Sequence, residues 1–463
     1  MEQTKENKMG TMPVNRLLIT MSLPMMISML VQALYNVVDS IFVSRINENA
    51  LTAVSLAFPI QTLMIAVAGG TCVGINAVLS KALGEKDRER ADNTAASGIV
   101  LMAASYVLFL LIGLFATRAF YLSQTDDTQI VEFGVQYLSI VCSCSFGLFT
   151  QFVFERLLQS TGRTFYIMIT QGTGALINII LDPIFIFGLF GMPQMGVAGA
   201  AVATVIGQTV AGVIALVVNF KKNEDIHIRF KGFRLGREIV GQIYKIGVPS
   251  MIMQAIGSVM TYGMNLILIS FTPTATAVFG VYFKLQSFIF MPVFGLNNGL
   301  VPILAYNYGA GRRDRFVNAL KCGIVYAVGI MAVGVAVFQT IPAVLLGFFE
   351  ASDEMLRIGV PALRIICLSF LPAGFGIVCG TAFQALGNAV YSMLVSIARQ
   401  LVVLLPAAFL LSLSGEVTYV WWAFPIAEVM SLTMTVIFLV RINGRVIRHI
   451  GEQTEEKAVS PAE

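Results

Sequence analysis

The sequence has 463 residues, of which 57% are apolar and 12% are charged, about half the charged share of an ordinary soluble domain. The net charge of +4 is spread over several loops, so it forms no basic patch of the kind that binds nucleic acid. These values exclude an ordinary soluble protein. They indicate an integral membrane protein whose main solvent is the bilayer.

The segment 1–14 is polar and charged and contains no apolar core followed by a small-residue cleavage site, which predicts a cytoplasmic tail rather than a removable signal peptide. Apolar runs long enough to span a bilayer then continue from Leu17 to Arg441,. We predict an all-α polytopic membrane protein with twelve transmembrane helices, at 15–43, 50–81, 92–117, 129–158, 164–190, 194–220, 239–270, 274–306, 315–346, 354–383, 389–414 and 418–444.

Lysine and arginine concentrate in every second predicted loop, as in 81–90, 221–237 and 311–315. Short cytoplasmic loops of membrane proteins carry an excess of these residues. Both termini are therefore predicted in the cytoplasm, with the protein in the cell inner (cytoplasmic) membrane.

The cysteines and the motif content argue against an enzyme. All six cysteines fall in apolar runs, so they predict free, buried thiols rather than a disulfide framework or a zinc site. The sequence has no zinc-ligand spacing, no G-x-S-x-G motif and no nucleotide-binding loop,. We expect no catalytic residues and no cofactor.

An internal repeat relates the two halves of the chain. An offset of 225 in residue number takes Pro24 to Pro249, and the same offset takes Gln159 in LLQSTG to Gln384 in AFQALG. The GEKDR and GRRDR loops match after a two-residue shift, which pairs Gly84 with Gly311.

Six helices per half give two pseudo-symmetric six-helix bundles related by an axis along the membrane normal, an arrangement common in transporters. The predicted organisation is a cytoplasmic tail at 1–14, an N-terminal bundle at 15–220, a cytoplasmic linker at 221–238, a C-terminal bundle at 239–444 and a cytoplasmic tail at 445–463.

Two acids distinguish the first half from the second. Asp39 lies deep in the first predicted helix. The residue at the equivalent position of the second half, its repeat mate, is Met264. Asp182 aligns with Leu405, because each of these two residues is followed by a proline. A carboxylate inside the bilayer costs several kcal/mol, about 3 on translocon-insertion scales, so such residues mark functional sites by default. In the alternative role, Asp39 and Asp182 only stabilise the packing of helices through hydrogen bonds.

Other polar residues share helix faces with these acids. Tyr35 and Asp39 are four residues apart, as are Asn178 and Asp182, and Thr204 adds a hydroxyl on the sixth helix,. Two carboxylates close together in a low dielectric cannot both ionise easily, so the pair suits a proton. Asp39, Asn178, Asp182 and Thr204 equally offer the oxygen ligands that Na⁺ prefers.

The second half carries its own intramembrane charges. Lys284, Arg364, Arg399 and Glu428 form an ion-pair network or help to bind substrate. Glu155 and Arg156 lie near a predicted cytoplasmic helix end, which favours snorkelling side chains there.

The chain resembles the multidrug and toxic compound extrusion (MATE) family, closest to its bacterial MepA-like branch. The resemblance covers residues 10–445 and rests on LYNVVDSIFVSRI, ALGEKDRERA, LLQSTGR, NIILDPIFIFG, GVAGAAVATVIGQ, their repeat copies and VWWAFPIAEV. It implies two six-helix lobes around a central cavity and export of organic, often cationic, drugs in exchange for Na⁺ or H⁺. It also implies a cation site at Tyr35, Asp39, Asn178, Asp182 and Thr204. Some relatives use a seventh-helix acid where this chain has Gly257.

The predicted function is a secondary active multidrug exporter that antiports organic compounds against inward H⁺ or Na⁺. Its partners are small-molecule substrates and membrane lipid, and one chain contains a complete pathway, which predicts a monomer. A methionine- and aromatic-rich cavity suits promiscuous binding; its expected residues are Met253, Met260, Phe288, Phe290, Lys284, Arg399 and Glu428. The alternative function is a flippase for a lipid or lipid-linked precursor, which the second-half cations favour.

Overall fold

The computed structural model describes residues 7–46, 48–228, 235–349 and 351–452, and every regular element in these ranges is a helix. Within these ranges, eleven helices are long and apolar enough to cross a membrane. A twelfth span results if α6 (Thr128–Ser143) and α7 (Phe146–Ser160), bent by 41° at their junction, are counted as one. The predicted all-α polytopic fold is confirmed. The central part of the predicted linker, 229–234, lies outside the described residues.

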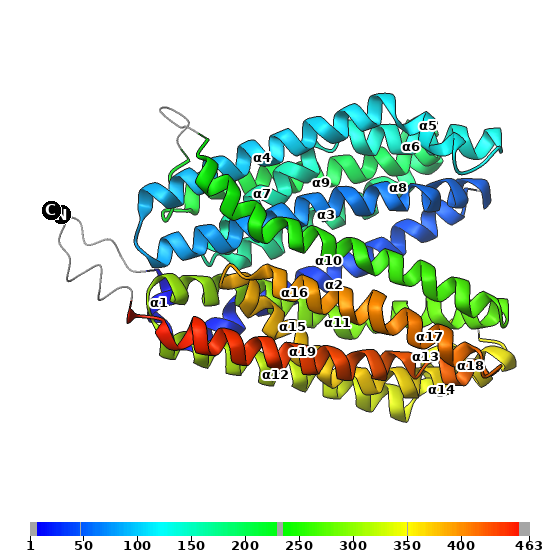
Figure 1. Ribbon diagram of the computed structural model, residues 1–463. Helices are drawn as coiled ribbons and strands as arrows, with labels where there is room; N and C mark the ends of the chain where they lie inside the picture. The colour runs from blue at the N-terminus through cyan, green and yellow to red at the C-terminus, as the bar shows by residue number, and fades with distance from the viewer. Residues whose placement is uncertain (1–6, 47, 229–234, 350, 453–463) are drawn as a thin grey trace. The chain divides into compact units, whose positions relative to one another are not determined.

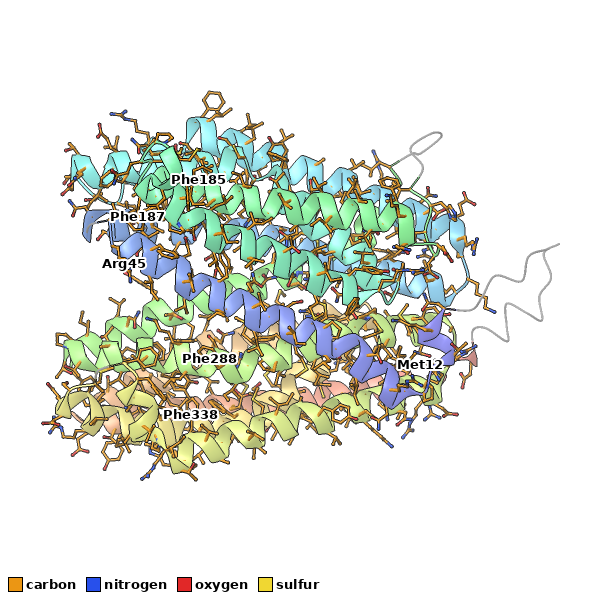
Figure 2. The ribbon with its side chains drawn as sticks, turned by 180° about the vertical axis from the view of Figure 1, so that it is seen from behind. Met12, Arg45, Phe185, Phe187, Phe288 and Phe338 are labelled. Atoms are coloured by element: carbon orange, nitrogen blue, oxygen red, sulfur yellow. The ribbon has the colours of Figure 1, made fainter. Side chains whose placement is uncertain are left out.

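The first half of the chain begins with a short helix, α1 (Lys8–Thr11), and a long one, α2 (Val14–Ser44). Figure 2 shows α2 lengthwise, with Met12 and Arg45 labelled just beyond its two ends. Most of its helices match the predicted apolar runs to within a few residues. The further elements are α3 (Glu48–Gly84), α4 (Arg88–Phe115), α5 (Thr117–Leu122), α6, α7, α8 (Thr164–Phe187), η1 (Leu189–Gly191) and α9 (Val197–Lys222).

The second half repeats this order with two additional breaks. Its elements are α10 (Arg237–Ile269), α11 (Pro273–Gly309), α12 (Arg313–Thr340), α13 (Pro342–Gly347), α14 (Asp353–Ile366), η2 (Cys367–Ser369), α15 (Phe370–Ala385), α16 (Ala389–Ile397), η3 (Ala398–Leu404), α17 (Leu405–Ser412), α18 (Val417–Val420), α19 (Ala423–Arg445) and η4 (Ile447–His449). The segment η3 is a π-helix, a form often found at functional sites.

The repeat extends through the helix ends at the constant offset of 225. The bounds of α3, α4 and α5 recur in α11, α12 and α13, and α8 recurs in the run from α16 to α17. The turns recur too, since Gly162 and Gly387 both have left-handed backbones, with φ of +83° and +77°. Glycine adopts this conformation without steric cost.

One part of the sequence alignment is wrong. The predicted two-residue shift paired Gly84 with Gly311, but α3 ends at Gly84 and α11 ends at Gly309. The left-handed residue of each loop is Lys86 (φ +61°) or Gly311 (φ +66°), again at the constant offset. The resemblance of GEKDR to GRRDR therefore follows residue type and not the geometry of the turn. The same constant offset places Ala407, not Leu405, opposite Asp182, and both are apolar.

The described helices form two compact units. The amino-terminal unit comprises 27–83 and 87–251, and the carboxy-terminal unit comprises 252–463 together with 84–86 and the chain before residue 27. Figure 1 shows the helices of each unit running alongside one another, with α9 against α7 and α8 in the first and α11 against α12 and α15 in the second. The initial part of α2 thus belongs with the second half of the chain, and the initial part of α10 with the first half.

Glycines allow these exchanged segments to pack closely. A Cβ at Gly74 on α3 would lie 2.1 Å from the backbone oxygen of Ile243 on α10, and a Cβ at Gly299 on α11 would lie 2.3 Å from Ser22 Oγ on α2. The two glycines are repeat mates at the constant offset. Small residues at such positions let helix backbones approach in membranes, so the repeat preserves the contact as well as the helix lengths.

Candidate cation-binding site

The two acids singled out in the sequence lie together inside the amino-terminal unit. Asp39 on α2 and Asp182 on α8 are within hydrogen-bonding contact through their carboxyl groups. The outer parts of these helices also touch through the rings of Phe42 and Phe187, whose centroids are 6.5 Å apart. Figure 2 shows Arg45 and Phe187 where α2 and α8 end. Asp182 is fully buried.

Asn178 connects Asp182 to α9. In the amide orientation that satisfies both ends of the side chain, Asn178 donates to Asp182 Oδ2 at 3.0 Å and accepts from the Thr204 backbone N–H at 3.0 Å and from the Thr204 hydroxyl at 3.1 Å. The Tyr35 hydroxyl is also hydrogen-bonded with Thr204. The structure therefore brings all five sequence-predicted residues into one connected network from three helices.

Two buried oxygens in this network have no hydrogen-bond partner among the residues that the structure describes. They are Asp39 Oδ1 and Asp182 Oδ1. Orphaned carboxylate oxygens in a buried site are costly unless a proton or a cation satisfies them. Together with the Asn178 carbonyl and the Thr204 hydroxyl they offer hard oxygen donors, which fit Na⁺ by ligand type and fit a proton shared between the two acids.

Two further residues adjoin the site and were missed from the sequence. Gln61 on α3 donates from Nε2 to the Tyr137 hydroxyl on α6 at 3.0 Å, and Tyr137 interacts electrostatically with Asp39 and Tyr35. Gln61 corresponds to Gln286 in the second half at the offset of 225. Nothing in the linear pattern joins Gln61 to Tyr137, which lies three helices further along the chain.

The sequence-predicted cavity residues lie in the carboxy-terminal unit with unequal exposure. Met260 and Phe290 are both buried, and the Phe290 ring packs edge-on against Phe370 at 5.2 Å. Phe288, labelled in Figure 2, is 50% exposed, and Met253 is half-buried. Exposure makes Phe288 and Met253 available to a ligand, whereas Met260 and Phe290 contribute to the packing of the unit.

The second-half charges include one ion pair. Arg399, in the π-helix η3, approaches Glu428 on α19 with Nη1 3.2 Å from Oε2, and Glu428 is 5% exposed. Lys284 is exposed and places its Nζ 5.8 Å from the centre of the Phe349 ring, within cation–π range. Arg364 is also exposed, and the Gln339 side chain donates to its backbone oxygen at 2.8 Å.

The snorkelling expected of Glu155 is wrong. Glu155 is 6% exposed and points into the amino-terminal unit, because α7 packs there against α8 and α9. Its distance from the helix end along the sequence was a poor guide, since neighbouring helices cover that end.

A bundle of apolar helices with a buried polar carboxyl pair and a parallel internal repeat defines a membrane transporter. The chain belongs to the MatE family, whose model matches residues 24–184 and 249–410. The two matched segments begin at the repeat prolines, Pro24 and Pro249. The resemblance to the multidrug and toxic compound extrusion family is thereby confirmed, and this is a family of transporters rather than enzymes.

Curated relatives and solved structures agree over nearly the whole length. "Multidrug export protein MepA" of Staphylococcus haemolyticus is 28% identical over 423 residues, which cover 91% of this chain and 92% of that protein. A structure described as the outward-facing conformation of a multidrug resistance MATE family transporter is 26% identical, with a TM-score of 0.90 over 96% of this chain and 99% of that one. A transporter of the MOP superfamily from Pyrococcus furiosus is 25% identical, with a TM-score of 0.89 over 97% and 99%.

Proposed function

We propose that this protein is a secondary active exporter that moves organic, often cationic, compounds out of the cell in exchange for inward H⁺ or Na⁺. The coupling ion binds at Asp39 and Asp182, with Asn178, Thr204 and Tyr35 completing the site. One observation carries the proposal: two carboxyl groups are in contact inside an apolar bundle, and each has a buried oxygen that no described residue hydrogen-bonds.

Repulsion between the charges of Asp39 and Asp182 couples cation release to a movement of the helices. With a proton or Na⁺ bound, Asp39 and Asp182 remain in contact; without it, two like charges in a low dielectric repel each other. Asp39 lies on α2 and Asp182 on α8, so loss of the cation drives the outer part of α2 away from α8. A ligand changes such an equilibrium only by binding the two arrangements unequally, and the carboxyl pair meets that requirement.

The basic loops support a location in the cell inner membrane with both termini in the cytoplasm. Residues 163 and 221–222 then mark the cytoplasmic ends of α8 and α9, and both helices bring their site residues toward the outer side. Each chain contains both units, which supports a monomer as the transporting species.

The substrate is proposed to contact the exposed Phe288 and the half-buried Met253, with Lys284 and the Arg399–Glu428 pair in the same unit. A lipid flippase would use these cations for an anionic head group. Glu428 neutralises Arg399 at 3.2 Å, which weakens the flippase alternative and favours organic molecules without a fixed phosphate.

The test is efflux of ethidium from proteoliposomes under an imposed pH or Na⁺ gradient. Wild-type protein is expected to respond to one of the two gradients, and Asp39→Asn and Asp182→Asn are expected to reduce gradient-driven efflux about a hundredfold, as loss of a positioned proton-transfer group does. Glu132→Gln, an exposed acid on α6, is the matched control and keeps wild-type rates.

Three results would count against the proposal. Unchanged efflux in both aspartate variants would show that Asp39 and Asp182 only stabilise helix packing. No gradient response in the wild type, with transport of a lipid phosphate instead, establishes the flippase. Flux at channel rates excludes antiport. Thermal stability in detergent, measured for every variant, separates loss of function from loss of fold.

A further inference from the structure

A second buried acid lies in the amino-terminal unit, apart from the site described above. The Glu155 carboxylate on α7 accepts three hydrogen bonds: at Oε1 from Gln151 Nε2 at 3.0 Å and from the Thr170 hydroxyl at 2.7 Å, and at Oε2 from Gln171 Nε2 at 2.8 Å. All three donors are neutral. A carboxylate inside a membrane bundle that is surrounded by hydrogen-bond donors is a functional-site candidate by default.

Only one of the two polar atoms of the Gln171 amide makes a hydrogen bond in the described part of the chain. Its nitrogen donates to Glu155, whereas its Oε1 is buried and accepts no hydrogen bond from any described residue. Rotation of the amide about its terminal bond would present Oε1 to Glu155. A protonated Glu155 then donates from Oε2–H to Gln171 Oε1, while Oε1 of Glu155 keeps its bonds from Thr170 and Gln151. The site thus holds the carboxyl group in either protonation state.

Gln171 lies on the same face of α8 as the outer acid. Gln171, Asn178 and Asp182 are spaced by seven and four residues, which places them on one stripe of an α-helix. Eleven residues separate Gln171 from Asp182, about 16 Å along the axis. The neighbouring helix α9 carries Thr204 at the outer site and the half-buried Gln208 one turn further toward Glu155.

Among the described residues, no cation forms an ion pair with the Glu155 carboxylate. Arg156 donates to Gln159 Oε1 at 2.6 Å, and it and the Cys72 thiol of α3 are the groups that interact electrostatically with Glu155. Apart from Asp182, the other charged residues of the packed helices lie at or near helix ends. Lys81 is in the last turn of α3, Arg88 and Glu89 are exposed at the start of α4, Arg90 bonds Gln242, and Asp92 accepts from the His227 backbone. Arg163 pairs with Asp225 at 3.2 Å, and Lys221 and Lys222 end α9.

The second half of the chain has no counterpart of this cluster. At the constant offset of 225, Glu155 corresponds to Gly380, Thr170 to Val395 and Gln171 to Ser396. A cluster needed only for packing would be expected in both bundles, because most of their helices recur at the same or nearly the same bounds. The polar shell accompanies the Asp39–Asp182 pair in the first half alone.

We propose that Glu155 is a second proton-binding group, which receives the proton released from the Asp39–Asp182 pair and passes it to the aqueous phase beyond the Thr164 end of α8. The inference rests on the proposed antiport and commits it to protons. The transfer balances: one carboxyl of the outer pair loses a proton, Glu155 Oε2 gains one, and its later release restores the Gln171 N–H donation to the carboxylate.

The test compares two kinds of transport in proteoliposomes. In Glu155→Gln, pH-gradient-driven efflux of ethidium is expected to fall about a hundredfold, the lower part of the range for a positioned proton-transfer group, while gradient-free exchange of ethidium across the membrane persists. A packing role would impair both. The protonated-carboxyl band in pH-difference infrared spectra is expected to lose one component in this variant but not in Glu132→Gln.

A second variant covers the case in which Glu155→Gln fails to fold. Thr170→Val removes one donor that stabilises the ionised carboxylate, so the pH of half-maximal efflux is expected to move upward with the carboxyl group still present. Wild-type gradient-driven efflux in Glu155→Gln, an unmoved pH profile in Thr170→Val, or a wild type driven by Na⁺ alone would overturn the inference. The first two leave the proposed antiport intact if Asp39→Asn still abolishes efflux.

Discussion

The two halves of the chain share helix bounds at a constant offset but differ in what their helices bury. The first half holds Asp182 in contact with a second acid, Asp39, and Glu155 among neutral donors, whereas the second half holds Glu428 paired with Arg399. Apolar runs, loop lengths and close-contact glycines therefore set the shared architecture. The two halves differ in role because a small number of buried polar residues differ between them.

The difference also concerns helix regularity. α8 is one α-helix from Thr164 to Phe187, with Pro183 inside it, while the equivalent run in the second half is interrupted by the π-helix at 398–404. A π-helix changes the direction of the side chains along it, and here it carries Arg399. The first half thus places acids on a regular helix face, and the second places a cation at an irregularity.

A reciprocal exchange of the repeat mates gives the largest expected effects. Asp39→Met is expected to abolish gradient-driven efflux while the protein remains folded, because methionine already occupies the equivalent buried position in the second half. Met264→Asp is expected to lower the free energy of unfolding by about 3 kcal/mol, the cost of an unpaired carboxylate in a membrane helix. Ethidium efflux and thermal denaturation in detergent measure the two. Equal destabilisation by both exchanges would show that the halves differ in packing and not in function.

The ion pair of the second half offers the next largest effect. Arg399→Ala leaves Glu428 buried without its partner and is expected to lower the free energy of unfolding by about 2 kcal/mol, since the partial exposure of Arg399 reduces the usual cost of such a break. Glu428→Gln on its own is expected to cost less, and the double variant less than Arg399→Ala. A double-mutant cycle in detergent measures the coupling. Additive effects would mean that the close approach of Arg399 to Glu428 contributes no stability.

The initial parts of α2 and α10 pack closely against the other half of the chain's sequence, and disturbing either contact is expected to lower the free energy of unfolding by a similar amount. Gly74→Ala pushes a methyl group against the backbone oxygen of Ile243, which cannot move aside, and is expected to cost about 2 kcal/mol. Gly299→Ala meets the Ser22 hydroxyl first and is expected to cost somewhat less. Gly280→Ala has open space around it and serves as the control. A Gly74→Ala protein with wild-type thermal stability would contradict the close packing of α3 with α10.

The helices, the repeat and the five residues of the outer site could be predicted from the sequence because each leaves a local signal. Apolar runs give the spans, and i, i+4 spacing gives the shared faces of Tyr35 with Asp39 and of Asn178 with Asp182. The Glu155 shell could not be predicted, since Gln151, Thr170 and Gln171 meet it only after α7 and α8 pack. The π-helix at Arg399 has no sequence signal that we recognise, and motif similarity misaligned the loop after α3.

That loop gives the smallest expected effect. Lys86 and Gly311 hold the same left-handed position, with φ of +61° and +66°, but only glycine does so without a steric cost of about 1 kcal/mol. Gly311→Ala is expected to lower the free energy of unfolding by about 1 kcal/mol. Lys86→Gly is expected to be neutral or slightly stabilising, because relief of strain offsets the added freedom of the unfolded chain. Thermal denaturation of the two variants in the same detergent measures the difference. If Lys86→Gly costs as much as Gly311→Ala, the lysine contributes through its charge, and the two loops share a backbone shape without sharing what stabilises it.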